Sequence, residues 1–229
     1  MNYAQLTAAI ESYTENQFPD VTLADGSIDT TAQQLARFVQ QAEQRIYNTV
    51  QFPALRKNVT GSTSVGNKYL ACPNDFLAVY SLAVIAPVTG EYTFLLNKDV
   101  NFIREAYPSP TSTGTPRFYA LFGPQSSDPK ELSMLMGPTP DAAYGVELHY
   151  FFYPESIVTA NNTWLGDNFD SVLLYGSLVE AYTFMKGEPD MITLYENKYK
   201  EALAMAKRLG DGMERGDAFR NGQYRQAVT

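Results

Sequence analysis

Apolar side chains near the N-terminus recur at intervals of three and four residues, the spacing that places them on one face of an α-helix. This spacing predicts a first helix over residues 2–15 and, after a loop over residues 18–28, a second helix that runs to about Val50. The segment Thr30-Thr31-Ala32-Gln33 has the form of a capping box at the start of the second helix. The apolar stripe of that helix leaves polar residues, Glu43 among them, on its outer side.

From about residue 55 to residue 153 the pattern changes to alternation with a period of two, interrupted by Gly, Pro, Ser and Thr. Such a pattern predicts strands and turns. Residues 99–107 have the spacing of a short helix, and residues 108–116 contain three prolines and no apolar anchor, which predicts a long loop. The expected strands include residues 76–85, 118–122, 132–136 and 146–153.

Helical spacing returns over residues 168–186, where Asp167 stands at the capping position. Apolar residues cover more than one face of this helix, which indicates that other elements or other subunits surround it. Gly187-Glu188-Pro189 ends it, and a last helix over residues 190–209 is expected to lie antiparallel to it. Residues 210–229 contain too few apolar anchors to pack a core of their own.

These patterns predict an α+β fold in which a bundle of N- and C-terminal helices carries an inserted antiparallel β domain, either a sandwich or a barrel. Residues 1–54 supply the N-terminal helices and residues 55–165 the β-rich insertion. Residues 166–210 form the closing helical hairpin. Residues 211–229 are expected to be an extended tail.

Composition narrows the possible functions of the 229-residue chain. A net charge of −8 and a pI near 4.7 argue against phosphate-backbone binding, which requires clustered Lys and Arg. The single cysteine, Cys72, excludes an internal disulfide and is expected to act as a small apolar residue. The first residues lack the features of a signal peptide, and no apolar run approaches the roughly 20 residues that span a bilayer. We therefore expect synthesis in the cytoplasm and no membrane partner.

Catalytic and metal-binding groups are sparse, and we expect no catalytic residues, no metal and no cofactor. The only histidine, His149, lies in an aromatic strand and is expected to be half-buried on a sheet face. Asp25 and Asp29 flank Gly26 without the ligand pattern of an EF-hand, so we interpret them as solvated loop acids, with calcium binding as the alternative. Glu147 and Glu155 are candidates for a glycosidase pair, although nothing in their spacing singles them out.

The order of these elements resembles the head-to-tail adaptor proteins, also called head-completion or connector proteins, of tailed bacteriophages, in particular short-tailed ones. The likeness covers most of the chain and rests on loose patterns rather than on a catalytic signature. The segments that carry it are residues 31–50, Phe52-Pro53-Ala54-Leu55-Arg56, residues 69–76, residues 174–181, Gly187-Glu188-Pro189 and residues 195–203.

The resemblance implies a structural virion protein of the tail or neck, synthesised in the host bacterial cytoplasm. Identical subunits, about twelve of them, would form a homo-oligomeric ring under the portal protein, with the helices in the ring wall. The β domain would face outward toward the tail nozzle or tail fibres. Packaged double-stranded DNA would pass through the ring without sequence-specific binding, which suits an acidic protein. The family attaches to the portal through a C-terminal extension, and the residues expected to dock here are Met213, Arg215, Phe219, Arg220, Tyr224 and Arg225.

Two alternatives remain open at this point. A glycan-binding or cell-wall-degrading tail component would use the aromatic residues and carboxylates of the β region, with Glu147 and Glu155 as its acids. Another ring of the same tail, such as a nozzle or gatekeeper, would share the structural character of an adaptor.

Overall fold

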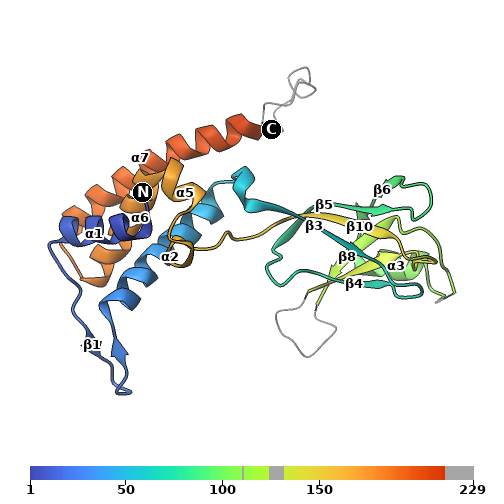
Figure 1. Ribbon diagram of the computed structural model, residues 1–229, viewed down its shortest axis with the longest axis horizontal. Coiled ribbons are helices and arrows are strands. Elements are labelled where there is room, and N and C mark those ends of the chain that lie inside the picture. Colours follow the sequence, from blue (N-terminus) through green and yellow to red (C-terminus); the bar gives the residue numbers. More distant parts are fainter. Residues whose placement is uncertain (110, 124–131, 215–229) are drawn as a thin grey trace. The chain divides into compact units, whose positions relative to one another are not determined.

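The computed structural model describes residues 1–109, 111–123 and 132–214, and it shows the predicted α+β class of fold (Figure 1). The chain divides into two units. The first, here called the helical unit, consists of Met1–Ala54 and Pro154–Thr229, and the second, the β unit, consists of Leu55–Tyr153. In the described residues the helical unit holds all the α-helices except one, and the β unit holds the two four-stranded sheets.

Both N-terminal helices, α1 (Tyr3–Thr14) and α2 (Thr31–Thr49), begin with a capping box. At α2 the Thr30 hydroxyl accepts a hydrogen bond from the backbone N–H of Gln33, whose side chain accepts one from the backbone N–H of Thr30. The capping box predicted at this position is therefore confirmed. Between the two helices lie two short strands, β1 (Val21–Thr22) and β2 (Ile28–Asp29), which pair antiparallel.

The C-terminal part of the helical unit contains α4 (Ile157–Ala160), α5 (Trp164–Asn168), α6 (Asp170–Phe184) and α7 (Pro189–Glu214). Helix α6 contacts α1, α2, α5 and α7, so other helices surround it as its sequence predicted. Its buried residues accordingly point in several directions: Val172, Leu173, Leu174, Gly176, Ser177, Leu178, Val179 and Ala181.

Two predicted helix ends are wrong. The helix expected over residues 168–186 starts at Asp170 as α6, and Asp167 does not cap it. Asp167 lies instead inside a separate helix, α5, which Thr163 caps by accepting a hydrogen bond from the N–H of Gly166. Phe169 breaks the helical conformation between α5 and α6, with a φ of −137° and a ψ of 46°. Its ring lies 5.4 Å from that of Phe52. The second wrong end is that of the last helix, because α7 continues to Glu214 instead of ending near residue 209.

One sheet of the β unit has the strand order β3–β10–β5–β6. Its strands are β3 (Arg56–Ser62), β5 (Ala78–Ile85), β6 (Tyr92–Phe94) and β10 (Gly145–Phe151). The second sheet has the order β4–β9–β8–β7. It contains β4 (Tyr69–Ala71), β7 (Leu96–Asn97), β8 (Phe118–Phe122) and β9 (Ser133–Gly137), and α3 (Val100–Ala106) packs against β8.

Residues from both sheets form the main core of the β unit. Along β10 the alternation predicted from the sequence is confirmed, since Val146, Leu148 and Tyr150 are buried in this core while the residues between them are partly exposed. Cys72 is 6% exposed and belongs to the same core, as expected of a small apolar residue. The antiparallel β domain expected from the sequence is confirmed for the other paired strands of the two sheets, whereas β7 runs parallel to β8.

Candidate interaction surfaces

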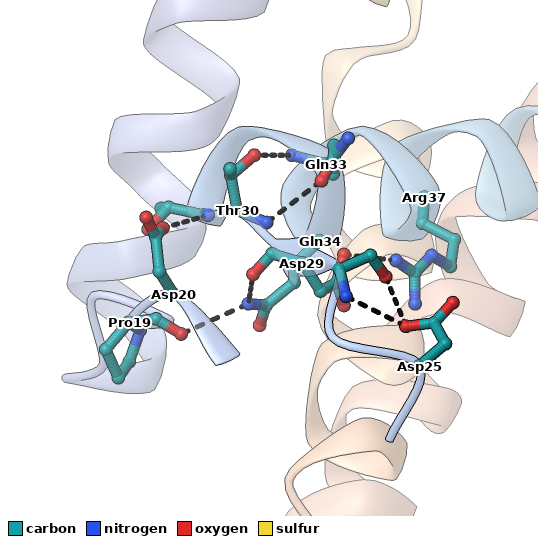
Figure 2. Close-up of polar contacts among 10 residues, drawn as sticks. Pro19, Asp20, Asp25, Asp29, Thr30, Gln33, Gln34 and Arg37 are labelled. Atoms are coloured by element: carbon teal, nitrogen blue, oxygen red, sulfur yellow. Dashed lines mark hydrogen bonds and ion pairs between the residues drawn. The ribbon is translucent and has the colours of Figure 1, made fainter. Parts of the chain in front are cut away.

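Polar side chains fasten the β1–β2 hairpin to the start of α2 (Figure 2). The amide of Gln34, which is 1% exposed, donates hydrogen bonds to the carbonyl oxygens of Pro19 at 3.1 Å and Asp29 at 3.0 Å. The carboxylate of Asp29 pairs with the guanidinium of Arg37 at 2.6 Å. One buried amide therefore holds both arms of the hairpin, and one ion pair holds its second strand against α2.

The two acids considered as calcium ligands have protein partners instead. A carboxylate oxygen of Asp25 accepts hydrogen bonds from the hydroxyl and the backbone N–H of Ser27, and these bonds lower the pKa of Asp25. Asp29 is 7% exposed and paired with Arg37, so its interpretation as a solvated loop acid is wrong. Among the residues that the structure describes, there is no group of three or more side chains suited to hold a metal ion.

A groove of about 470 Å³ lies between the hairpin and the outer side of α2. Leu23 and Ile28 line it from the hairpin, and Gln33, Arg37 and Gln40 line it from α2. The apolar hairpin residues are prominent on the surface, since Leu23 is 47% and Ile28 58% exposed. The groove thus combines apolar contact area with charged and amide groups, a mixture typical of protein interfaces.

A second exposed apolar surface lies on the β unit, where cations stand over aromatic rings. The ammonium of Lys98 lies 5.4 Å from the ring centre of Phe102, and the guanidinium of Arg104 lies 5.8 Å from that of Phe122. Both rings are 42% exposed. Aromatic and arginine side chains are enriched at interfaces, so this surface is also suited to contact another protein.

His149 and Glu147, which were considered for catalysis, belong to a polar row on the first sheet of the β unit. Nδ1 of His149 lies 3.1 Å from the hydroxyl of Ser81, and Nε2 lies 3.9 Å from a carboxylate oxygen of Glu147, which also accepts a hydrogen bond from Asn58. A base in a catalytic triad is oriented by a hydrogen bond of about 2.6 to 3.2 Å, shorter than the Glu147 contact. Glu155, the other suggested acid, belongs to the helical unit.

Of the expected portal-docking residues, only Met213 lies within the described part of the chain. Arg215, Phe219, Arg220, Tyr224 and Arg225 lie outside the described residues. Met213 belongs to α7, which continues to Glu214, so the first residues of the expected tail, 211–214, are helical rather than extended.

Sequence reasoning missed two features of the helical unit. The hairpin was predicted as a loop, although the turn pair Asp25-Gly26 between Val21-Thr22-Leu23 and Ile28-Asp29 is the signal of a short hairpin. Glu43 was predicted on the outer side of its helix but is 3% exposed, and nothing local in the sequence indicated its burial.

Within the described residues, no helix is both long and apolar enough to cross a membrane. A comparison with curated proteins gives no match. A family model described as SU10 adaptor protein matches residues 1–226, which include both units. Since the match covers nearly the whole sequence, the chain belongs to the SU10 adaptor protein family of bacteriophages.

Proposed function

We propose that the chain is a structural adaptor of the virion neck, in which about twelve copies form a ring between the portal and the tail. The observation that carries this proposal is the family match over residues 1–226, because it includes both the helical unit and the β unit. Membership of an adaptor family implies a structural role and association with portal and tail proteins in general.

The two units offer different surfaces for these contacts. In the proposed arrangement the N- and C-terminal helices form a bundle in the ring wall, and the β domain inserted between them faces outward toward the nozzle or fibres. The aromatic and cationic surface formed by Lys98, Phe102, Arg104 and Phe122 supports this second assignment, because such side chains dominate the binding energy of many interfaces.

The C-terminal tail, residues 211–229, is proposed to dock on the portal through Met213, Arg215, Phe219, Arg220, Tyr224 and Arg225. The path of α7 supports this role. A Cβ at Gly210 would lie 2.9 Å from the carbonyl oxygen of Gln51, so α7 passes close to the end of α2 just before the tail begins. In the proposed complex, contacts of Phe219 and Tyr224 with the portal would supply much of the binding energy.

The acidic composition supports a channel function for the ring. A protein of net charge −8 repels the phosphates of packaged double-stranded DNA, so the duplex can pass without being held by sequence-specific or backbone contacts.

The test is a mass measurement of the purified protein with and without its phage's portal ring. We expect a complex that carries one adaptor per portal chain. Deletion of residues 211–229 should abolish the complex while the circular dichroism of the helices is retained. A matched control carries a tail of the same composition in scrambled order, which keeps its charge and length. If the truncated protein still joined the portal, or if the scrambled tail bound as well as the native one, the proposed docking role of the tail would be wrong.

A further inference from the structure

Strand β3 has the longest free edge in the described part of the chain. It consists of seven residues and lies at the end of its sheet, with β10 as its one neighbour. Each of the other described strands at a sheet edge has no more than three residues. A free strand edge presents unpaired backbone N–H and C=O groups, to which a strand of another chain can bond.

Alternate residues of β3 direct their backbone groups to this free edge. Leu55 and Thr63, which flank β3, form backbone hydrogen bonds of 3.0 Å and 2.9 Å with the two residues that flank β10. Hydrogen-bonded positions alternate along an antiparallel pair, so the odd-numbered residues between them also bond to β10. Asn58, Thr60 and Ser62 therefore point their N–H and C=O groups away from β10, toward the free edge.

An apolar groove, here called the β3 groove, lies beside this edge between β3 and β4. Val59 and Gly61 line it from β3, Leu70 from β4, and Val146 and Leu148 from β10. Its volume of about 340 Å³ is many times the roughly 30 Å³ that one water molecule occupies in the liquid. A Cβ added at Gly61 would meet no further atom within 4 Å. The groove therefore has room for side chains of an added strand.

The edge beside the groove lacks the features that usually keep strands from pairing. Residues 58–62 contain no proline and no charged side chain, and their pairing with β10 has no bulge. The nearest charge on β3, the ammonium of Lys57, is paired with Asp75 at 2.8 Å. A strand that approaches residues 58–62 therefore meets neither a bulge nor an unpaired charge of β3.

The edge and the groove together select an extended chain as the occupant. A small apolar molecule would use the groove alone, whereas a strand also bonds to the backbone groups beside it. Since all residues that line the groove are uncharged, the strand side chains that enter it are apolar.

A second copy of this chain does not meet these requirements. Its only described free edge longer than three residues is β3 itself. The side chains of β3 on the groove side belong to Lys57, Val59 and Gly61, and Val59 already packs against its own core. The occupant is therefore a segment of a different protein.

We infer that β3 and the β3 groove bind an extended, uncharged segment of another protein as an additional strand, with apolar side chains at alternate positions of that segment. Its backbone bonds to Asn58, Thr60 and Ser62, and its apolar side chains enter the groove beside Gly61 and Leu70. This inference goes beyond the proposed function, because binding of this kind requires neither a ring nor the portal.

Peptide binding to the full-length protein tests the inference. The probe is a short synthetic peptide in which valine and threonine alternate, with a lysine at each end for solubility and a fluorophore whose anisotropy reports binding. Two matched peptides carry backbone N-methyl groups, one on its threonines and the other on its valines. Alternate residues of a strand bond at opposite edges, so each methylated peptide has lost the donors of one edge.

Two pairs of variants locate the site. Thr60→Pro removes an N–H that faces the free edge without breaking the pairing with β10, and Thr60→Val is its control because it keeps that N–H. Gly61→Phe fills the groove, and Gly61→Ala is its control. Circular dichroism verifies the fold of each variant, and hydrogen exchange measured by NMR reports the amides of β3.

We expect the unmethylated peptide and only one of the methylated peptides to bind, with the other at least about tenfold weaker. Binding should slow the exchange of the amides of Asn58, Thr60 and Ser62. Thr60→Pro and Gly61→Phe should each weaken binding by at least about tenfold, and their controls by less than about threefold.

Four results would overturn the inference. They are no binding of the unmethylated peptide, equal binding of the two methylated peptides, unchanged exchange along β3, and full binding by both Thr60→Pro and Gly61→Phe. If the protein without peptide dimerised with slowed exchange at Asn58, Thr60 and Ser62, the occupant would be a second copy, and the inference would also be wrong. None of these results bears on whether the chain joins the portal.

Discussion

The carboxylate of Glu43, in the middle of α2, accepts a hydrogen bond of 2.5 Å from the hydroxyl of Ser156, which lies 113 positions further along the chain. Its other oxygen accepts a hydrogen bond of 2.9 Å from the backbone N–H of Ile157, the first residue of α4. Burial raises the pKa of Glu43, although both hydrogen bonds act in the opposite direction. The segment that re-enters the helical unit after the β unit is thus tied to α2 by one buried acid.

Replacing Glu43 with alanine should destabilise the protein by about 2 to 3 kcal/mol, because the buried donors of Ser156 and Ile157 lose their acceptor. Glu43→Gln should cost less, since its amide oxygen still accepts from Ile157 and its amide N–H can donate to the hydroxyl of Ser156. Urea unfolding at pH 7 measures both changes. An alanine variant as stable as the parent protein would show that these bonds contribute little.

The raised pKa of Glu43 makes the stability of the protein depend on pH. A folded-state pKa above the unfolded value means that the native protein binds more protons between the two values. The stability contributed by protonated Glu43 is therefore fully present below the unfolded pKa of about 4.3 and is lost as the pH rises through the folded pKa. The stability difference between the parent and Glu43→Gln should shift in favour of the parent as the pH is lowered from neutral. Unfolding curves at several pH values check this, and a constant difference would contradict it.

The buried Tyr150 and the exposed Asp75 are linked within the β unit. The phenol O–H of Tyr150 donates a 2.8 Å hydrogen bond to one carboxylate oxygen of Asp75, and the ammonium of Lys57 donates one of 2.8 Å to the other. The bond from Lys57 is the main reason that the pKa of Asp75 is lowered. Tyr150→Phe keeps the ring in the core and should cost about 1 kcal/mol. It should also move the pKa of Asp75 back toward its ordinary value, which an NMR titration follows.

A matched control for Tyr150→Phe is Tyr80→Phe. Tyr80 is 53% exposed, whereas Tyr150 is 1% exposed. Removal of the exposed hydroxyl should change the stability by no more than about 0.5 kcal/mol. Equal effects of the two substitutions would mean that the link to Asp75 does not stabilise the sheet.

Gly176 lets α6 approach its neighbours closely. A Cβ at this position would lie 3.2 Å from the Cβ of Ala42 on α2 and 3.2 Å from Cε2 of Tyr199 on α7. Gly176→Val should therefore destabilise the helical unit by about 1 to 3 kcal/mol through overpacking, despite the better helix propensity of valine. Ala204→Val, at an exposed position of α7, is the control and should cost less than about 1 kcal/mol. Thermal unfolding compares them, and a tolerated Gly176→Val would refute the close packing.

The features that were predicted correctly are those encoded by neighbouring residues. The capping box at Thr30 and the alternating burial along β10 depend on residues a few positions apart, so periodicity and local hydrogen bonding reveal them. The β1–β2 hairpin was missed because its ladder contains only two residues in each strand. An alternation of apolar and polar residues over two positions is too short to distinguish a strand from a loop.

The errors arise where distant parts of the chain meet. Glu43 is expected on the outside because its charge, taken alone, favours solvent, and its hydrogen bonds with Ser156 and Ile157 make its burial acceptable. Phe169 ends α5 where its ring packs on Phe52 and Trp164, and this contact has no signature in the helical spacing. The groove beside the hairpin likewise depends on Gln34 reaching two carbonyl groups, which no periodic pattern predicts.

The ends of the β unit lie next to each other, because the backbone N–H of Phe152 donates a 3.0 Å hydrogen bond to the carbonyl oxygen of Leu55. Residues 55–153 also have their own core, so we expect them to fold as an isolated protein with a cooperative unfolding transition. The complementary variant joins Ala54 to Pro154 through a short Gly/Ser linker and should retain helical circular dichroism. As a control, Leu148→Asp, which places a charge in the core of the β unit, should unfold the isolated segment. If residues 55–153 remained unfolded while the linked helical unit folded, the β unit would depend on contacts outside itself, and neither the adjacency of its ends nor its core would suffice to make it an independent domain.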